Sequence, residues 1–281
     1  MKRIVAASIA IIASNFGCHS VTQGAPPAVT VAVQGVRVTK PPPEGDEMLR
    51  AFNAFPGTTV ALAVTEPRGG LVVFDIDASR VKSFVDDKGK DLTKSDPGTK
   101  TEVPENWVFT PGWLVSKDRK HCSLEVTVPG TPSRGATTLA LSGTLVFKCA
   151  TEKKDFTTQN VSLHAGAQVS AGAIPLTIKS AGKPRFGGDD KSTEIEFHAK
   201  QTLDAIIRMK FFDATGIRIE AEEAGRGVET TPDGGSAPAI QDATICYRLK
   251  DAGNMAKIVV TCWTDIGAVA IPLDLKVGLG L

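Results

Sequence analysis

Short runs of alternating hydrophobic and polar residues dominate this chain. Residues 29–38 (VTVAVQGVRV) alternate, and residues 58–65 (TTVALAVT) form a second run rich in β-branched side chains. Alternation with a period of two places apolar side chains on one face of a β-strand. Proline and glycine at 41–45 and 66–70 end these runs, because proline lacks a backbone donor and glycine permits turns. The pattern predicts an all-β chain.

A cysteine-containing pattern occurs twice. HCSLEV at 121–126 is followed by LVFKCATE at 145–152, and ICYRLK at 245–250 is followed by IVVTCWTD at 258–265. Self-similarity of this kind indicates which lengths of chain fold as equivalent units. We therefore expect two tandem antiparallel β-sandwich domains related by internal duplication.

A second pair of segments keeps the same order. FVDDKGKDL at 84–92 and FFDATGIRI at 211–219 both read as strand, Asp-x-x-Gly turn, strand. The first domain is accordingly expected at 28–165 and the second at 166–281. Each would hold roughly seven or more strands, a count typical of sandwich domains.

This architecture resembles immunoglobulin-like and fibronectin-like modules in its plan alone. Immunoglobulin domains place two cysteines on opposite sheets with a tryptophan between them. Here Trp263 directly follows Cys262, and Cys246 lies a short distance before it. The resemblance implies a sandwich fold and no particular ligand.

The first residues have the pattern of a secretory signal, expected at 1–17. Lys2 and Arg3 supply the positive end, and the apolar run at 4–13 has the length of a signal-peptide core. That run is too short to cross a bilayer as a helix. The pattern predicts export.

The end of this signal, NFGC at 15–18, resembles a bacterial lipobox. Gly17 and Cys18 match, whereas Asn15 stands where the family usually has an aliphatic residue. The resemblance implies that Cys18 receives a lipid, that 18–27 is a tether, and that the membrane is a partner. His19 is not the aspartate that favours inner-membrane retention, so outer-membrane placement is favoured. Ordinary signal cleavage and secretion is the alternative.

Setting Cys18 aside leaves an even number of cysteines, which suits disulfides in an oxidising compartment: Cys122, Cys149, Cys246 and Cys262. The repeat favours pairing Cys122 with Cys149 and Cys246 with Cys262. A turn-forming cluster at 251–254 predicts that the second pair faces across a hairpin. Neither pair has the short Cys-x-x-Cys spacing of zinc sites, so no metal is expected.

Composition excludes some functions. A formal net charge of +1 lacks the basic excess of nucleic-acid-binding proteins. The chain has 281 residues, of which 42% are hydrophobic, and that suits two packed domains. Acidic residues at 86–87 resemble turn-forming side chains more than a calcium loop.

Two tryptophans, Trp107 and Trp113, flank a Pro-Gly pair and are the candidate ligand contacts. Exposed, their rings would suit a sugar or a partner protein; buried, they would be core aromatics, which we favour. The four histidines form no recognised catalytic or metal-binding motif, so no catalytic residue and no cofactor is expected.

The sequence thus predicts a non-enzymatic lipoprotein of the cell envelope, or a secreted protein, with a binding or structural role. Its partners would be the membrane, through the lipid, and an unidentified protein or glycan. A carbohydrate-binding protein and an envelope hydrolase are the alternatives. The hydrolase requires a histidine and a carboxylate to converge in a cleft beside a serine.

Overall fold

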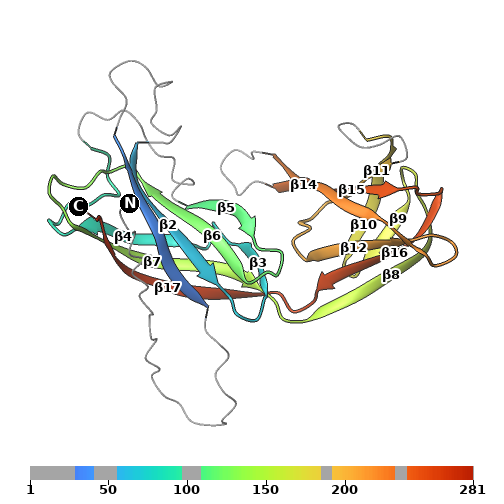
Figure 1. The fold of residues 1–281 in the computed structure, drawn as a ribbon, viewed down its shortest axis with the longest axis horizontal. Helices are drawn as coiled ribbons and strands as arrows, with labels where there is room; N and C mark the ends of the chain where they lie inside the picture. The colour runs from blue at the N-terminus through green and yellow to red at the C-terminus, as the bar shows by residue number, and fades with distance from the viewer. Residues whose placement is uncertain (1–28, 41–55, 97–108, 185–191, 232–238, 281) are drawn as a thin grey trace, which may run out of the picture. The chain divides into compact units, whose positions relative to one another are not determined.

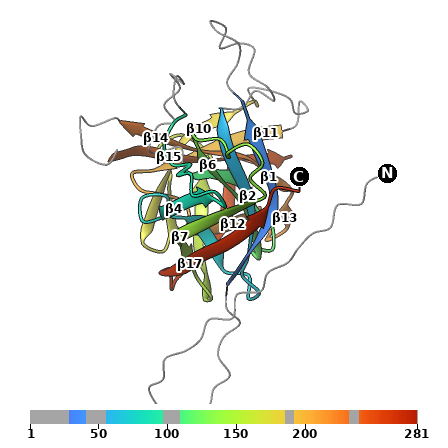
Figure 2. The ribbon, with the colours of Figure 1, turned by 90° about the vertical axis from the view of Figure 1, so that its left-hand side faces the viewer.

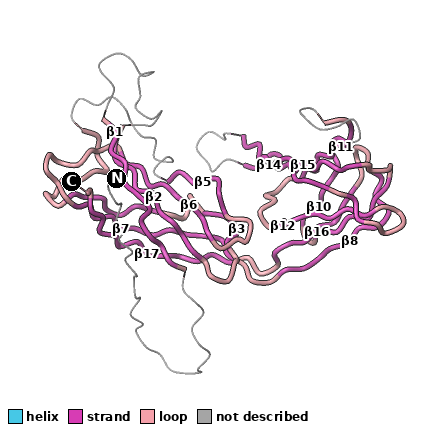
Figure 3. Tube along the Cα trace, viewed as in Figure 1, coloured by secondary structure: helices cyan, strands magenta, loops and turns pink. Residues whose placement is uncertain are grey.

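A computed structural model describes residues 29–40, 56–96, 109–184, 192–231 and 239–280 (Figure 1). Strands joined by turns and loops make up all of these residues (Figure 3). The expected all-β class is confirmed, with every strand pairing antiparallel. Within the described ranges, no helix is long and apolar enough to span a bilayer.

The chain folds into two compact units whose limits differ from the expected tandem domains. Unit 1 combines Met1–Cys149 with Gly267–Leu281, and unit 2 is Ala150–Ile266. The expected boundary between 28–165 and 166–281 is therefore wrong, because the last strand returns to the first unit. A strand's partner is chosen by tertiary pairing, so sequence order alone did not reveal it.

Two sheets form unit 1. One has the order β1-β2-β6-β5, and the other has the order β17-β7-β3, with β4 also paired to β7. Their bounds are β1 Thr30–Thr39, β2 Gly57–Thr65, β3 Leu71–Phe74, β4 Arg80–Asp86, β5 Phe109–Val115, β6 His121–Val128, β7 Thr138–Cys149 and β17 Gly267–Gly278. β17 runs beside β7 along its whole length (Figure 2).

The core of unit 1 joins the inner faces of both sheets. Leu62 on β2 and Leu141 on β7 belong to one buried cluster. β17 adds four alternate side chains to that cluster: Ile271, Leu273, Leu275 and Val277. Burial of each such side chain contributes about 1.5–3 kcal/mol. Unit 1 therefore depends on a strand that comes from the far end of the chain.

Unit 2 also has two sheets, one with the order β14-β15-β11-β10-β9 and the other β13-β12-β16-β8. Their bounds are β8 Lys153–Ser162, β9 Gln168–Ala171, β10 Ile174–Gly182, β11 Ser192–Ala199, β12 Ile206–Phe212, β13 Arg218–Ile219, β14 Ala221–Thr231, β15 Ala239–Lys250 and β16 Met255–Trp263. Phe197, Phe211 and Tyr247 lie in its buried cluster.

Tyr247 ties the two sheets of unit 2 together. Its hydroxyl on β15 accepts a hydrogen bond from the Met209 amide on β12 at 3.1 Å and donates to Glu223 Oε2 at 3.2 Å. Burial, with the nearby Glu223 carboxylate, raises the pKa of this phenol. It therefore stays neutral and keeps its proton for Glu223.

The two Asp-x-x-Gly segments form the expected turns and share one hydrogen-bond pattern. Asp86 Oδ1 accepts from the amides of Lys88 at 3.0 Å and Lys90 at 2.9 Å. Asp213 Oδ1 accepts from the amides two and four residues later, at 2.8 and 2.9 Å. Gly89 and Gly216 have φ values of 83° and 86°, a conformation that favours glycine.

Candidate functional site

The sequence-predicted contact residues are only partly placed. Cys18 and Trp107 lie outside the described residues, and Trp113 belongs to β5. The third tryptophan, Trp263, ends β16 and is 4% exposed. Lys153 lies opposite it on β8, with Nζ 4.5 Å from the ring centroid. Trp263 is therefore a covered side chain of the sheet surface.

The expected hairpin between Cys246 and Cys262 is wrong. Cys246 is on β15 and Cys262 is on β16, which belong to different sheets. Cys262 is 3% exposed in the core, whereas Cys246 lies between the inward-facing Ile245 and Tyr247 and so points to the outer face. Successive side chains of a strand point to opposite faces, so this geometry does not bring the two sulfurs together.

Cys122 and Cys149 have a different relationship. Both are in the buried cluster of unit 1, on β6 and β7 in its two opposing sheets. The thiols are free in this structure, and burial raises the pKa of each. Burial also raises the pKa of Cys262 to about 11. Such thiols are poor nucleophiles at neutral pH.

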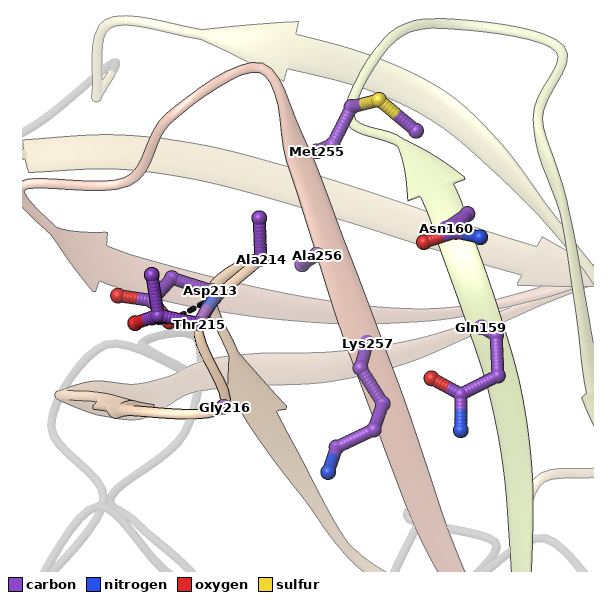
Figure 4. Close-up of a pocket in the computed structure, with 9 residues that line it drawn as sticks. All are labelled: Gln159, Asn160, Asp213, Ala214, Thr215, Gly216, Met255, Ala256 and Lys257. Carbon is purple, nitrogen blue, oxygen red and sulfur yellow. Dashed lines mark hydrogen bonds between the residues drawn. The ribbon is translucent and has the colours of Figure 1, made fainter.

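A pocket of about 280 Å³ lies on the outer face of the β12-β16-β8 sheet of unit 2 (Figure 4). The turn between β12 and β13 forms one wall, β16 forms the floor, and β8 forms the other wall. Its lining combines polar and apolar residues: Gln159, Asn160, Asp213, Ala214, Thr215, Gly216, Met255, Ala256 and Lys257.

A β-bulge shapes the β8 wall. Ala256 pairs with Val161 and Ile258 pairs with Thr158, so Gln159 and Asn160 together face Lys257. Asn160 has a φ of 51°, a left-handed conformation that asparagine tolerates better than most residues. Bulges re-aim side chains. Both amide side chains line the pocket for this reason (Figure 4).

The wall formed by the β12–β13 turn carries Asp213, whose carboxylate is kept ionised by hydrogen bonds within the turn. Thr215 donates to Asp213 Oδ1 through Oγ1 at 2.7 Å and through its amide at 2.8 Å. The Thr215 hydroxyl and the neighbouring amides lower the pKa of Asp213. Lys257 supplies the opposite charge, and its Nζ lies 4.4 Å from the Phe212 ring centroid.

Chemically, the pocket offers amide, hydroxyl, ammonium and carboxylate groups around a space of small-molecule size. Such groups orient a polar ligand by hydrogen bonds. The Lys257 cation and the Asp213 anion leave the lining without a dominant charge. In the part of the chain that the structure describes, no three His, Cys, Asp or Glu side chains gather as a metal site.

A histidine and a carboxylate do meet, on the outer face of the other sheet of unit 2. His198 Nδ1 on β11 is 3.1 Å from Asp242 Oδ1 on β15. Lys179 lies beside them, with Nζ 3.8 Å from Asp242 Oδ2 and 3.2 Å from Glu196 Oε1. The His198–Asp242 pair thus belongs to a surface network of charges.

The described hydroxyls of Thr244 and Ser180 are not aligned with that pair. Thr244 is directly opposite His198, but a Cβ added at Gly227 on β14 would lie 3.1 Å from its Oγ1. The Thr244 hydroxyl therefore lies toward β14, on the side of β15 away from β11. Ser180 hydrogen-bonds to Glu196 Oε2 at 3.3 Å.

No protein-family model, curated protein or solved structure matches this chain. Sequence reasoning identified the Asp213 turn but missed Gln159, Asn160 and Lys257. The position of Asn160 in the pocket could not be predicted from the sequence, because only the strand pairing shows that β8 has an extra residue there.

Proposed function

We propose that this protein is an exported, lipid-anchored, non-enzymatic binding protein of the cell envelope. The pocket on the β12-β16-β8 sheet of unit 2 is the observation that carries the binding role. The pattern of the first residues supports export, and the lipobox resemblance supports a lipid on Cys18 with a tether at 18–27. Outer-membrane placement is the preferred form, and a secreted protein is the alternative.

The ligand class that best fits the pocket is an uncharged, hydroxyl-rich molecule such as a glycan. The Gln159 and Asn160 amides each offer donors and acceptors, which suits hydroxyl groups that do both. Lys257 and Asp213 add one donor and one acceptor group of opposite charge. A strongly charged ligand would meet repulsion from the Lys257 ammonium on the floor or from the Asp213 carboxylate on the wall.

The pocket is tested by binding to a glycan panel with the native chain and two variants. We expect Lys257→Ala to lose most of the binding, because it removes a donor from the lining. The matched control is Lys82→Ala, an exposed lysine of β4 in unit 1. Equal binding by all three proteins, or no binding by the native chain, would contradict this function.

The anchor is tested by intact mass of the protein from its native membrane fraction. A diacyl or triacyl species beginning at Cys18 is expected. A mass that begins at another residue would remove the anchor and leave the pocket untouched.

We further propose that the two units arose by duplication. Constant-type immunoglobulin domains place strands A, B, E and D in one sheet and C, F and G in the other. Unit 1 matches this order, with β3 and β4 as one interrupted strand C. Unit 2 matches it with β10-β11-β15-β14 against β12-β16-β8. The shared pattern of the Asp86 and Asp213 turns supports the same relationship.

A further inference from the structure

Two strands, β8 at the start of unit 2 and β17 at the end of unit 1, do not pair with the strand that precedes them in the chain. β8 follows β7 after 150–152, yet it pairs with β16. β17 follows β16 after 264–266, yet it pairs with β7. Antiparallel neighbours separated by so few residues usually form a hairpin. Instead of the β7–β8 and β16–β17 hairpins, the chain forms the pairs β7–β17 and β16–β8, which we call the crossed pairings.

The two crossed strands occupy equivalent places. Cys149 near the end of β7 pairs with Leu71 on one side and Gly267 of β17 on the other. Cys262 near the end of β16 pairs with Ile206 on one side and Lys154 of β8 on the other. β17 therefore stands in unit 1 where β8 stands in unit 2. On the duplication proposed above, β8 and β17 have exchanged units.

The two connecting segments, 150–152 and 264–266, are hydrogen-bonded to each other. The Asp265 carboxylate accepts hydrogen bonds from the amides of Thr151 at 2.9 Å and Glu152 at 2.8 Å. The Thr264 amide donates to the Glu152 carbonyl at 3.2 Å. Neither segment turns its strand back onto the preceding one.

An exchanged strand makes the same contacts whichever chain supplies it. β17 pairs with β7 from Gly267 to Gly278 and buries four aliphatic side chains in unit 1. A β17 from a second copy would bring identical hydrogen bonds and identical side chains to that edge. The difference between the two forms lies in chain entropy and protein concentration, which is the usual basis of domain swapping.

We propose that the edge of β7 is a strand-acceptor site, and that its partner is β17 of a second copy of this chain. Two copies that exchange β17 reciprocally form a closed dimer in which both acceptor edges are filled. This is strand addition with the donor built into the partner. The inference does not depend on the ligand pocket or on the lipid anchor.

The test uses two full-length variants that each carry one new cysteine, Val146→Cys on β7 and Ala270→Cys on β17. These residues are direct partners across the two strands, on the face away from the core. The variants are unfolded, mixed, refolded at high concentration and oxidised. We expect a disulfide-linked species of twice the 29.5 kDa chain mass, with a peptide joining residues 146 and 270.

Two controls decide the result. Asp274→Cys pairs opposite Ser142, about 13 Å along the strand from position 270, so mixing it with Val146→Cys should give no such species. A chain carrying both Val146→Cys and Ala270→Cys should cross-link within itself at low concentration. Internal cross-linking without any link between chains would overturn the exchange between copies. Failure of both cross-links would overturn the β7–β17 pairing on which the inference rests.

Discussion

Asp265 and Thr151 lie 114 positions apart in sequence and are joined by three hydrogen bonds. The Asp265 carboxylate accepts from the Thr151 amide at 2.9 and 3.1 Å and from its hydroxyl at 2.6 Å. Thr151 lies in the segment 150–152 that enters unit 2 from β7, and Asp265 lies in the segment 264–266 that leaves unit 2 for β17. This contact therefore fixes the place where the two crossed strands leave their predecessors.

Asp265→Asn is expected to lower the melting temperature and to increase strand exchange between chains. The Thr151 hydroxyl and the Glu152 amide lower the pKa of Asp265. Its contribution is therefore present above the ordinary aspartate pKa and is lost as pH falls through the lowered one. Melting scans from neutral to acidic pH measure this, with Asp274→Asn on the outer face of β17 as control. Equal acid sensitivity of native and Asp265→Asn chains would contradict it.

Asp86→Asn is expected to destabilise unit 1 at neutral pH. Asp86 Oδ2 accepts from the Ser133 amide at 2.7 Å, and an asparagine amide placed there would oppose that donor. Although partial burial acts to raise it, hydrogen bonds from Ser133, Lys90 and Lys88 hold the pKa of Asp86 at about 2. That depression corresponds to about 2 kcal/mol, present above the ordinary pKa and lost as pH falls toward 2.

Urea unfolding at neutral pH and at low pH checks the Asp86 prediction. Asp213→Asn is the matched control, because Asp213 closes the same kind of turn in unit 2 but is less buried than Asp86. We expect the smaller loss there. Equal losses at both positions would show that the turn, and not the Ser133 contact, stabilises unit 1.

Leu273→Ala is expected to cost about 2–5 kcal/mol, the range for truncating a buried leucine. Leu273 is 3% exposed on β17. Because β17 belongs to unit 1, hydrogen exchange should accelerate at β7 and remain slow at β16. Lys276→Ala, on the outer face of the same strand, serves as control. Faster hydrogen exchange at β16, with β7 unchanged, would place β17 in unit 2 and contradict its pairing with β7.

A fragment of residues 150–266 is expected to fold by itself, since it contains every strand of unit 2 in one continuous stretch. A fragment of residues 166–281 lacks β8 and carries β17 without its β7 partner, so it should remain largely unfolded. Circular dichroism and amide-proton dispersion of the two fragments measure this. Folding of 166–281 with β17 paired to β16 would contradict the crossed arrangement.

Local features of the fold were predictable because they depend on neighbouring residues. Alternation in 58–65 predicted β2, whose inner face is buried as expected. The Asp-x-x-Gly segments predicted both turns, because the aspartate accepts hydrogen bonds from the turn's amides and the glycine adopts the positive φ that the turn requires. The direction of a side chain was harder to predict. Cys122, which aligns with Cys246 in the sequence pattern, faces the core of unit 1. A shift of one residue along a strand is enough to turn the Cys246 side chain to the outer face.

The pocket shows the same limit at the candidate site. The Asp213 wall follows from sequence, but the β8 wall depends on two residues facing one across β16. Strand register is set by packing over the whole sheet, so no spacing in sequence identified Asn160 and Lys257 as neighbours.

The sequence by itself determined the all-β class and the Asp-x-x-Gly turns, because periodicity and turn chemistry act over a few residues. Only the tertiary structure decided which strand completes which unit. β17 has the same alternating pattern beside β7 that it would have beside β16, so local preference does not choose between them. The choice is made by the buried side chains and by the crossed segments joined at Asp265 and Thr151.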